Sequence, residues 1–366
     1  MISFEQEWLM TEKHKVAILG SGNWGSTVAK IVGSNVKTKT ESFDPEVRVW
    51  VYEELVDGRK LTEIINSDHE NVKYLPGKKL PENVVAVPDP IEAVAGADIL
   101  VFVLPHQFVR GLCAKLRGNV REGAFAVSLI KGVEFDENGI VLISDVISKE
   151  LGVECSVLMG ANIANEIADE QFSEATIGYK NAAHAKLLQI IFQKPYFRIA
   201  GAPDIPGVEI CGALKNVVAL GAGFCDGLGY GNNTKAAVIR FGLLEMVRFA
   251  KKFFKNVQYT TFLQSSGVAD LITTCYGGRN RKCAEAFARA GGRKSFEELE
   301  VELLNGQKLQ GTLTAKEVHE VLQRQKLMKE FPFFEVIYDI VYEGRPVEQF
   351  LQELSEKELS LEGNIE

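Results

Sequence analysis

The sequence has few of the residues that build metal sites or disulfide frameworks. Its 366 residues include six cysteines and five histidines. No two cysteines form a CxxC pattern, and no two histidines have the spacing of metal ligands. We therefore expect reduced thiols, as in a cytoplasmic protein, and no metal site.

An excess of positive charge is also missing. The net charge of −8 argues against nucleic acid or an acidic membrane as a partner. We see no signal peptide, no transmembrane run, no repeat and no low-complexity tract, and the final GNIE matches no sorting signal, so we expect no membrane association and a cytoplasmic location. Residues 1–12 resemble a short frayed extension. The length suits two domains.

A glycine-rich turn follows the first strand-like run, Lys15 to Leu19. Its residues are Gly20, Ser21, Gly22, Asn23, Trp24 and Gly25, and a helical pattern continues to Val32. GxGxxG between a strand and a helix is typical of dinucleotide binding. The first glycine permits the tight turn, the second lets the pyrophosphate approach, and the third lets the helix pack on the strand. Helix amides would then bind the phosphates.

The next expected strand, Val47–Tyr52, ends in an acid, Glu53. Such an acid would accept a hydrogen bond from the adenosine ribose and repel a 2′-phosphate, which favours NAD over NADP. The interval from the glycines exceeds the usual ~20 residues, and a loop across residues 35–45 would explain this. The alternative is that Glu53 is a solvated acid at a helix start. Arg59 and Lys60 come late for NADP recognition.

Further strand-like runs alternate with helical segments, at residues 99–104, 124–130, 156–159 and 175–178. Continuously apolar strands in this order predict an α/β fold with a Rossmann-type, doubly wound parallel sheet. Ligands meet such sheets just beyond the carboxyl ends of the strands. Lys131 stands at one such end and is a candidate site cation; the alternative is an exposed loop lysine. His106 and residues 160–166 follow two other ends.

Prolines at 195, 203 and 206 mark a change of pattern, after which almost everything is predicted to be helical. We therefore predict an NAD-binding Rossmann-type domain over residues 1–203 and an all-α substrate-binding and catalytic domain over residues 204–366. The Lys/Glu-rich tail beyond Val347 is predicted to be a solvated terminal helix.

Between Glu209 and Asp226 the chain carries a single charge, Lys215, in an otherwise apolar run. The pattern predicts a helix that is buried on all sides, too short and too interrupted to be a membrane span. A lysine in such a helix is a candidate proton donor, and we expect its replacement by alanine to leave the fold intact or slightly more stable. The alternatives are a lysine that reaches solvent or forms a structural ion pair.

A second polar constellation follows at residues 267–281. Asp270 and Thr274 are one helical turn apart and should share a face. Gly277 and Gly278 should end that helix, so that Arg279 and Asn280 open the next one beside free backbone amides, which suits a phosphate. The alternative is an interdomain salt bridge. The polar loop at residues 305–311 is either a lid or a plain connection.

These segments together resemble the eukaryotic cytosolic NAD-dependent glycerol-3-phosphate dehydrogenases. The similar blocks are GSGNWGS, PHQF, SLIKGV, LMGANIA, CGALKNVVALGAGFCDGLGYGNNTKAA, GVADLITTCYGGRNRK and NGQKLQG, in the family's order, and the likeness runs from about Lys15 to Phe350. The resemblance implies a Rossmann-type N-terminal domain, an α-helical C-terminal domain and a cytosolic homodimer. The implied reaction is the reversible reduction of dihydroxyacetone phosphate by NADH to sn-glycerol 3-phosphate.

The resemblance also implies roles for individual residues. Lys215 matches the catalytic acid, with Asp270 holding it through a charge-assisted hydrogen bond. Its expected catalytic companions around the substrate are Lys131, Asn216, Asp270 and Thr274, and Arg279 and Asn280 match the phosphate clamp. The expected cofactor contacts are Gly20 to Gly25, Tyr52, Phe108, Ala164 and Arg279, with Lys308 and Gln310 on the closing loop.

Two other functions compete with this interpretation. A 6-phosphogluconate or β-hydroxyacid dehydrogenase would share a Rossmann domain, a helical second domain and a lysine. A non-enzymatic NADH-binding sensor would need neither a buried lysine nor a phosphate clamp.

Overall fold

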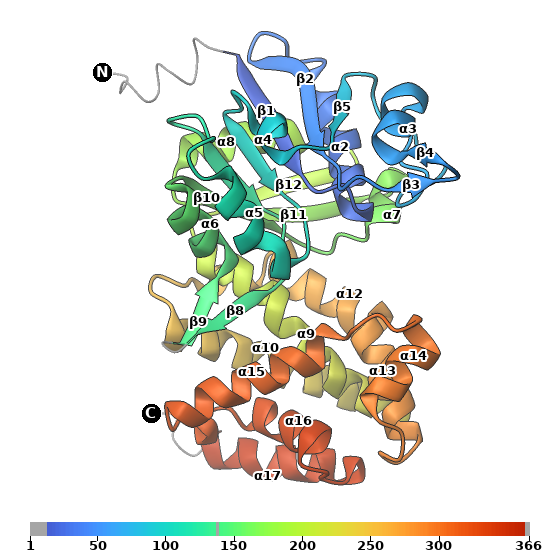
Figure 1. The fold of residues 1–366 in the computed structure, drawn as a ribbon. Coiled ribbons are helices and arrows are strands. Elements are labelled where there is room, and N and C mark those ends of the chain that lie inside the picture. The colour runs from blue at the N-terminus through green and yellow to red at the C-terminus, as the bar shows by residue number, and fades with distance from the viewer. Residues whose placement is uncertain (1–12, 137–138, 363–366) are drawn as a thin grey trace. The chain divides into compact units, whose positions relative to one another are not determined.

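The computed structural model describes residues 13–136 and 139–362 (Figure 1). The N-terminal extension and the final GNIE lie outside these ranges. The chain divides into two compact units. One comprises Met1–Val133 and Val141–Val208, and the other comprises Glu134–Ile140 and Glu209–Glu366. The chain passes between units inside helix α9 (Ile205–Gly227).

The first unit is an eight-stranded sheet in the order β12-β11-β10-β7-β6-β1-β2-β5. Its strands are β1 (His14–Leu19), β2 (Phe43–Trp50), β5 (Val84–Val87), β6 (Ile99–Phe102), β7 (Phe125–Ser128), β10 (Glu154–Met159), β11 (Ser173–Gly178) and β12 (Phe197–Ala202). Two small antiparallel pairs lie outside the sheet: β3 (Leu55–Val56) with β4 (Arg59–Lys60), and β8 (Val133–Asp136) with β9 (Gly139–Leu142), which belongs in part to the second unit. The sheet is mostly parallel, as predicted.

One strand pair departs from the predicted parallel sheet, because β10 and β11 are antiparallel. The helix between them, α7 (Ala164–Ala168), has five residues. It is too short to carry the chain back along the sheet, which a parallel neighbour requires. The longer helix α8 (Ala182–Phe192) does carry it back, so that β12 is parallel to β11.

Strand β12 was missed in the sequence because the prolines seemed to end the sheet before it. Pro195 and Pro203 lie just outside its two ends, where a strand tolerates proline. Strand β5 was missed as well. Strand β2 begins earlier than expected and ends at Trp50, so that Glu53 lies in the segment after the strand.

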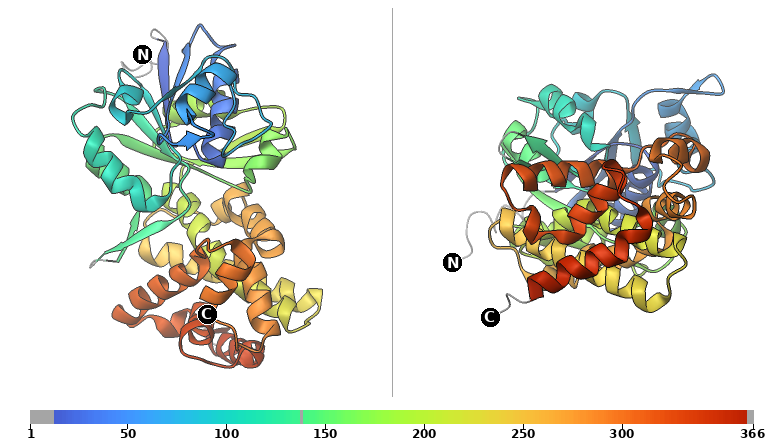
Figure 2. Two further views of the ribbon diagram at one scale, coloured as in Figure 1. Left: turned by 45° about the vertical axis from the view of Figure 1, so that its right-hand side comes forward. Right: turned by 90° about the horizontal axis from the view of Figure 1, so that it is seen from below.

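Helices cover both faces of the sheet, which makes it doubly wound (Figure 2). One face packs against α2 (Asn23–Val36), α3 (Leu61–Asp68) and α8, through side chains such as Val28, Leu61 and Leu188. The other packs against α4 (Pro90–Val94), α5 (Val109–Leu116) and α6 (Ile143–Leu151), through Val94, Leu112 and Ile147. Helices therefore cover both faces of the sheet, so ligands can reach it only at its edges.

The second unit is helical apart from the β8–β9 segment. Besides α9 it contains α10 (Asn232–Phe253), α11 (Tyr259–Phe262), α12 (Asp270–Gly277), α13 (Arg279–Arg289), α14 (Phe296–Leu304), α15 (Gln310–Arg324), α16 (Pro332–Tyr342) and α17 (Phe350–Glu362). Helix α17 is the predicted terminal helix, but it is not simply solvated. Phe350 and Leu354 are buried, and the Phe350 ring contacts those of Phe224 and Phe333.

Helix α9 confirms the prediction of a buried helix. It has the length and mean hydropathy of a membrane span, yet 94% of its most apolar window is buried inside the protein. A core helix gives the same apolar pattern as a membrane helix. Here it explains why Lys215, midway along α9, is enclosed.

Candidate active site

The glycine turn joins β1 to α2, and each of its glycines meets a different constraint. Gly20 has φ +126°, and a Cβ there would lie 2.3 Å from the Val103 carbonyl oxygen. A Cβ on Gly25 would lie 2.3 Å from the carbonyl oxygen of Gly20. Among the described residues, no atom would come within 4 Å of a Cβ on Gly22. The first and third glycines therefore serve packing, while the second borders open space that a ligand could fill.

The side chains of the turn hold it in place. Asn23 Nδ2 donates to the Tyr74 carbonyl oxygen at 2.7 Å and to Asn165 Oδ1 at 2.8 Å. The Ser21 carbonyl oxygen accepts from Asn71 Nδ2 at 2.8 Å. The Trp24 ring packs edge-on against Phe197. Of the expected cofactor contacts, Trp24 therefore offers its backbone amide rather than its ring.

Three further expected cofactor contacts, Tyr52, Phe108 and Ala164, also follow carboxyl ends of the sheet. Tyr52 follows β2 and is 72% exposed, and Phe108 lies beyond β6 and is 56% exposed. Ala164 opens α7, and its carbonyl oxygen accepts from Thr27 Oγ1 on α2 at 3.2 Å. Parallel strands bring their carboxyl ends to one edge, so two exposed rings and the glycine turn share that edge. Contact with a cofactor stays a prediction for all of them.

Glu53 does not begin a helix, as the alternative interpretation had it; it lies between β2 and β3 and is half-buried rather than solvated. Its carboxylate accepts from the Thr62 backbone N–H at 3.2 Å and from Thr62 Oγ1 at 2.6 Å, near the start of α3. A carboxylate has further acceptor sites, so ribose recognition stays a prediction. Arg59 pairs with Asp68 at 2.8 Å. Its guanidinium is thus engaged within its own segment.

Lys131 lies beyond β7, as predicted. Its Nζ donates to the carbonyl oxygen of Gly160 at 3.0 Å, and the side chain is half-buried. Gly160 follows β10, so Lys131 links the carboxyl ends of two neighbouring strands. It is thus a held side chain rather than an extended surface lysine.

In the second unit, Lys215 of α9 forms an ion pair and a hydrogen bond with Asp270 of α12. Lys215 is 5% exposed, and the Asp270 side chain is also buried. Taking two charges out of water is costly, so such a pair is weak evidence for stability and suggests a chemical role. The pair also changes one expectation. Replacing Lys215 by alanine would leave the Asp270 carboxylate buried without this cation, which destabilises the fold rather than sparing it.

Thr274 lies one turn after Asp270 on α12 and is buried. Its Oγ1 donates to the Asp270 carbonyl oxygen at 2.7 Å. The two side chains thus arise from adjacent turns of one helix, as their spacing predicted. The hydroxyl oxygen of Thr274 can still accept a hydrogen bond.

Asn216, the residue after Lys215, connects three helices. Asn280 Nδ2 on α13 donates to Asn216 Oδ1 at 3.0 Å. Asn280 Oδ1 accepts from the Gly311 backbone N–H on α15 at 2.9 Å. A Cβ on Gly311 would lie 2.6 Å from the Asn216 carbonyl oxygen. Only glycine permits this close approach, so the start of α15 is tied to the neighbour of Lys215.

Helix α13 begins immediately after Gly278, as predicted. Gly278 caps it without a side-chain hydrogen bond, so the first amides of α13 remain available for an anion. Arg279 at the first position is exposed, and its Nη1 donates to Gln307 Oε1 at 2.5 Å. The Arg279 guanidinium thus lies at the start of α13, next to Asn280, whose side-chain amide is bonded to Asn216 and Gly311. An anion site there stays a prediction.

The loop before α15 carries Lys308, whose Nζ donates to Glu300 Oε2 on α14 at 2.8 Å. The Lys308 side chain is 74% exposed. Gln310 is the first residue of α15. Sequence reasoning missed the role of Gly311 and of Glu300. Glu300 lies in the acidic run FEELEVELL, where nothing local separates it from the other glutamates.

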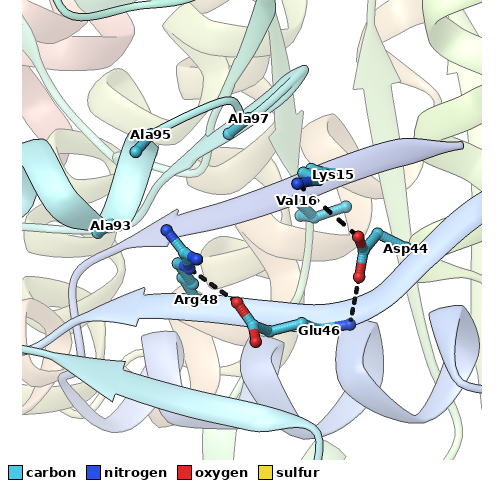
Figure 3. A pocket seen from close by; sticks show the side chains of 8 residues that line it. All are labelled: Lys15, Val16, Asp44, Glu46, Arg48, Ala93, Ala95 and Ala97. Carbon is cyan, nitrogen blue, oxygen red and sulfur yellow. Dashed lines mark hydrogen bonds and ion pairs between the residues drawn. The ribbon is translucent and has the colours of Figure 1, made fainter.

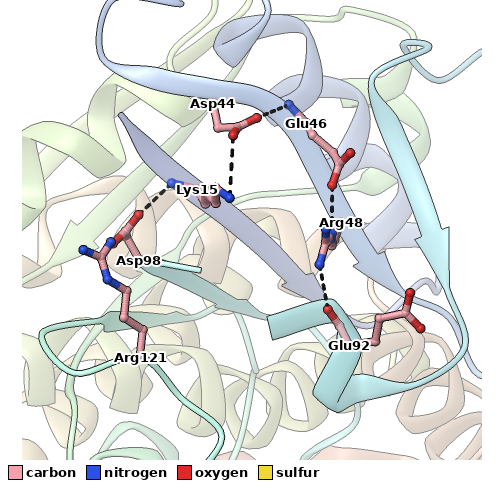
Figure 4. Close-up of polar contacts among 7 residues, drawn as sticks. All are labelled: Lys15, Asp44, Glu46, Arg48, Glu92, Asp98 and Arg121. Carbon is pink, nitrogen blue, oxygen red and sulfur yellow. Dashed lines mark hydrogen bonds and ion pairs between the residues drawn. The ribbon is translucent and has the colours of Figure 1, made fainter. Parts of the chain in front are cut away.

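A pocket of about 200 Å³ lies outside the candidate site, at the amino ends of β1 and β2 and away from the glycine turn (Figure 3). Its charged groups pair with one another, Arg48 with Glu46 at 2.8 Å and Lys15 with Asp44 at 3.9 Å. The Lys15 backbone N–H and Arg121 both bond the buried Asp98 carboxylate (Figure 4). Because this is the opposite end of the strands from the ligand edge, we assign it no role in the active site.

Comparisons with known proteins agree across both units. Residues 15–185 match the model for the NAD-dependent glycerol-3-phosphate dehydrogenase N-terminus, and residues 204–352 match the model for the C-terminus. The cytoplasmic NAD(+) glycerol-3-phosphate dehydrogenase of Bos taurus is 61% identical over 343 residues, which cover 93% of this chain and 97% of the relative.

Solved structures give the same result. The glycerol-3-phosphate dehydrogenase of Saccharomyces cerevisiae superposes with a TM-score of 0.90 and 48% identity, over 94% of this chain and 99% of that one. A GPDH chain of Dunaliella salina gives a TM-score of 0.87 and 48% identity, and the match covers 94% of this chain and 60% of the longer one. This chain therefore belongs to the NAD-dependent glycerol-3-phosphate dehydrogenase family.

Proposed function

We propose that this chain is a cytoplasmic NAD-dependent glycerol-3-phosphate dehydrogenase. It would reduce dihydroxyacetone phosphate with NADH to sn-glycerol 3-phosphate, and catalyse the reverse reaction. The observation that carries the proposal is the buried Lys215–Asp270 pair, in a helical unit where Arg279 and Asn280 open α13 and would form an anion site. A proton donor and a phosphate site are what a phosphorylated ketone requires.

The carboxyl edge of the sheet fits a dinucleotide. Open space beside Gly22 and the amides at the start of α2 suit a pyrophosphate, and the exposed rings of Tyr52 and Phe108 offer flat surfaces nearby. When bound, the nicotinamide supplies or accepts the hydride. The protein must then handle one proton and the charge on the substrate oxygen.

Lys215 would supply that proton. As hydride reaches C2 of the ketone, the carbonyl oxygen gains negative charge, and Lys215 Nζ would stabilise it and then protonate it. Asp270 would orient the ammonium through their hydrogen bond. In the reverse direction the neutral amine would accept the proton from the hydroxyl. Thr274 and Asn216 present polar groups on the same helices, and they and Lys131 stay predicted substrate contacts.

The phosphate would bind at the start of α13. The Arg279 guanidinium and the amides of α13 would neutralise its charge, with Asn280 held by Asn216 and Gly311. The phosphate is remote from the reacting carbon, so its binding energy would serve to position the ketone. The family resemblance also implies a homodimer, which light scattering on the purified protein would test.

A steady-state assay tests the function. NADH oxidation should require dihydroxyacetone phosphate and proceed well over ~10 times less efficiently with NADPH, because Glu53 would repel a 2′-phosphate. Turnover of β-keto acids or of 3-keto-6-phosphogluconate in its place would make this a dehydrogenase of the β-hydroxyacid class. NADH binding without hydride transfer to any of these substrates would instead indicate a sensor.

A further inference from the structure

The segment from Asn305 to Leu309 is organised around one residue, Glu300 of α14. The Glu300 carbonyl oxygen accepts from the backbone N–H groups of Asn305 and Gly306 and so closes the helix. Its carboxylate accepts from the Leu309 backbone N–H through Oε1 at 2.8 Å and from Lys308 Nζ through Oε2 at 2.8 Å. Both ends of the segment therefore depend on the same residue.

The two contacts of the Glu300 carboxylate contribute unequally to holding the segment in place. Lys308 lies on the surface, and an exposed ammonium is hydrated and screened, so its ion pair contributes little. Glu300 is 5% exposed and Leu309 is buried. A buried backbone N–H that loses its acceptor has no water to replace it. The bond from the Leu309 amide is thus the stronger anchor of the segment.

The segment reaches the groups expected to bind phosphate. Gln307 Oε1 accepts from Arg279 Nη1 at 2.5 Å. Just past Leu309, the Gly311 N–H donates to Asn280 Oδ1, and Asn280 Nδ2 in turn donates to Asn216 beside Lys215. Hydrogen bonds therefore connect Glu300 of α14 to the start of α15, and the start of α15 to the start of α13; the three helices are labelled in Figure 1. A shift of Leu309 would move the partners of both Arg279 and Asn280.

We propose that Glu300 is a positioning residue for the phosphate of the substrate. Its carboxylate holds the Leu309 backbone in place, and this sets the positions of Gln307 and Gly311 on either side. Gln307 and Gly311 in turn orient Arg279 and Asn280 toward the phosphate. This role rests on the proposed function, but the anchor itself can be tested without any substrate.

Two substitutions at Glu300 separate positioning from folding. Glu300→Ala removes both side-chain acceptors. Glu300→Gln keeps one oxygen for the Leu309 amide and loses only the screened pair with Lys308. Glu302, on the same helix, is exposed and pairs with Lys294, so Glu302→Ala is the matched control.

The first measurement is kcat/KM at saturating NADH, per folded molecule. We expect Glu300→Ala to lose about tenfold or more with dihydroxyacetone phosphate and less than about threefold with unphosphorylated dihydroxyacetone, since only the former uses the clamp. Glu300→Gln and Glu302→Ala should stay within about threefold of the wild type on both. Equal losses on the two substrates, or a Glu300→Gln enzyme as defective as Glu300→Ala, would overturn the proposal.

The second measurement is hydrogen exchange at the Leu309 amide in the absence of substrate. Its protection should disappear in Glu300→Ala and persist in Glu300→Gln. Unchanged protection in Glu300→Ala would refute the anchor, whatever the enzyme turns over. A wild-type protein inactive on dihydroxyacetone phosphate would refute the proposed function instead, so the two failures are distinguishable.

Discussion

At the scale of single residues, adding a side chain to a glycine of the glycine turn tests the cofactor proposal. Gly22 borders open space, whereas a Cβ on Gly25 would collide with backbone. Gly22→Val should therefore leave the melting temperature close to that of the wild type while weakening NADH binding by about tenfold or more, as the side chain fills the space for the pyrophosphate.

Gly25→Val is the comparison for that experiment. It should lower the melting temperature, because the helix can no longer pack on the strand. Fluorescence titration of NADH and calorimetry measure the two effects. Undiminished NADH affinity in Gly22→Val would place the cofactor elsewhere.

Arg279 gives a second residue-scale prediction, because its guanidinium is expected to bind the substrate phosphate. Arg279→Ala should cost on the order of 2–5 kcal/mol of transition-state stabilisation with dihydroxyacetone phosphate, because its guanidinium would pair with the phosphate in a site closed over the substrate, as in a buried charge pair. The loss with unphosphorylated dihydroxyacetone should be far smaller. Comparable proportional losses of kcat/KM on both would show that Arg279 acts on structure or on the cofactor. Arg289, exposed at the other end of α13, is the control position.

At the scale of elements, helix α15 contains Glu317, whose ionised form is disfavoured by burial in the fold. Burial, with a smaller effect from Glu320, raises the pKa of the Glu317 carboxyl from 4.5 to about 7. Because the folded pKa lies above the unfolded one, the protonated form favours folding. This stability is fully present below about pH 4.5 and is lost as the pH rises through about 7.

Glu317→Gln should therefore raise the melting temperature at about pH 8 and change it little at about pH 5. Thermal unfolding at both pH values measures this, with Glu302→Gln on α14 as an exposed control. A gain that is equal at the two pH values would show that Glu317 does not titrate with the fold.

Elements also show what sequence can and cannot predict. The apolar run between Glu209 and Asp226 predicted α9, because a helix buried on every side carries few charged residues. The glycines at 277 and 278 predicted the break between α12 and α13. The antiparallel β11 was not predictable from composition, since the direction of a strand depends on the length of the connection before it.

The site divides along the same line. Lys215, a charge in an unusually apolar setting, was identified as a candidate proton donor from the sequence. Glu300 and Gly311 were not found in this way, because their importance arises from contacts between helices that are far apart in sequence. Glu300 lies among several other glutamates and Gly311 follows a loop, so the sequence around each gives no sign of these contacts.

At the scale of the whole molecule, the cofactor is expected to bind the first unit, and Lys215 in the second unit is expected to transfer the proton. Lys215→Ala would disturb both the charge pair and the chemistry, because it leaves Asp270 without its cation. Lys215→Arg retains a cation for Asp270, yet a guanidinium cannot release its proton near neutral pH. The arginine variant therefore separates the two roles of the lysine.

The most direct test is kcat of Lys215→Arg at saturating NADH and dihydroxyacetone phosphate, alongside NADH affinity and melting temperature. We predict a fall of at least ~10²–10⁴ in kcat, the usual worth of a positioned acid, with NADH affinity unchanged in the first unit. A variant that binds NADH normally and retains kcat within about tenfold of the wild type would contradict the assignment of Lys215 as the proton donor.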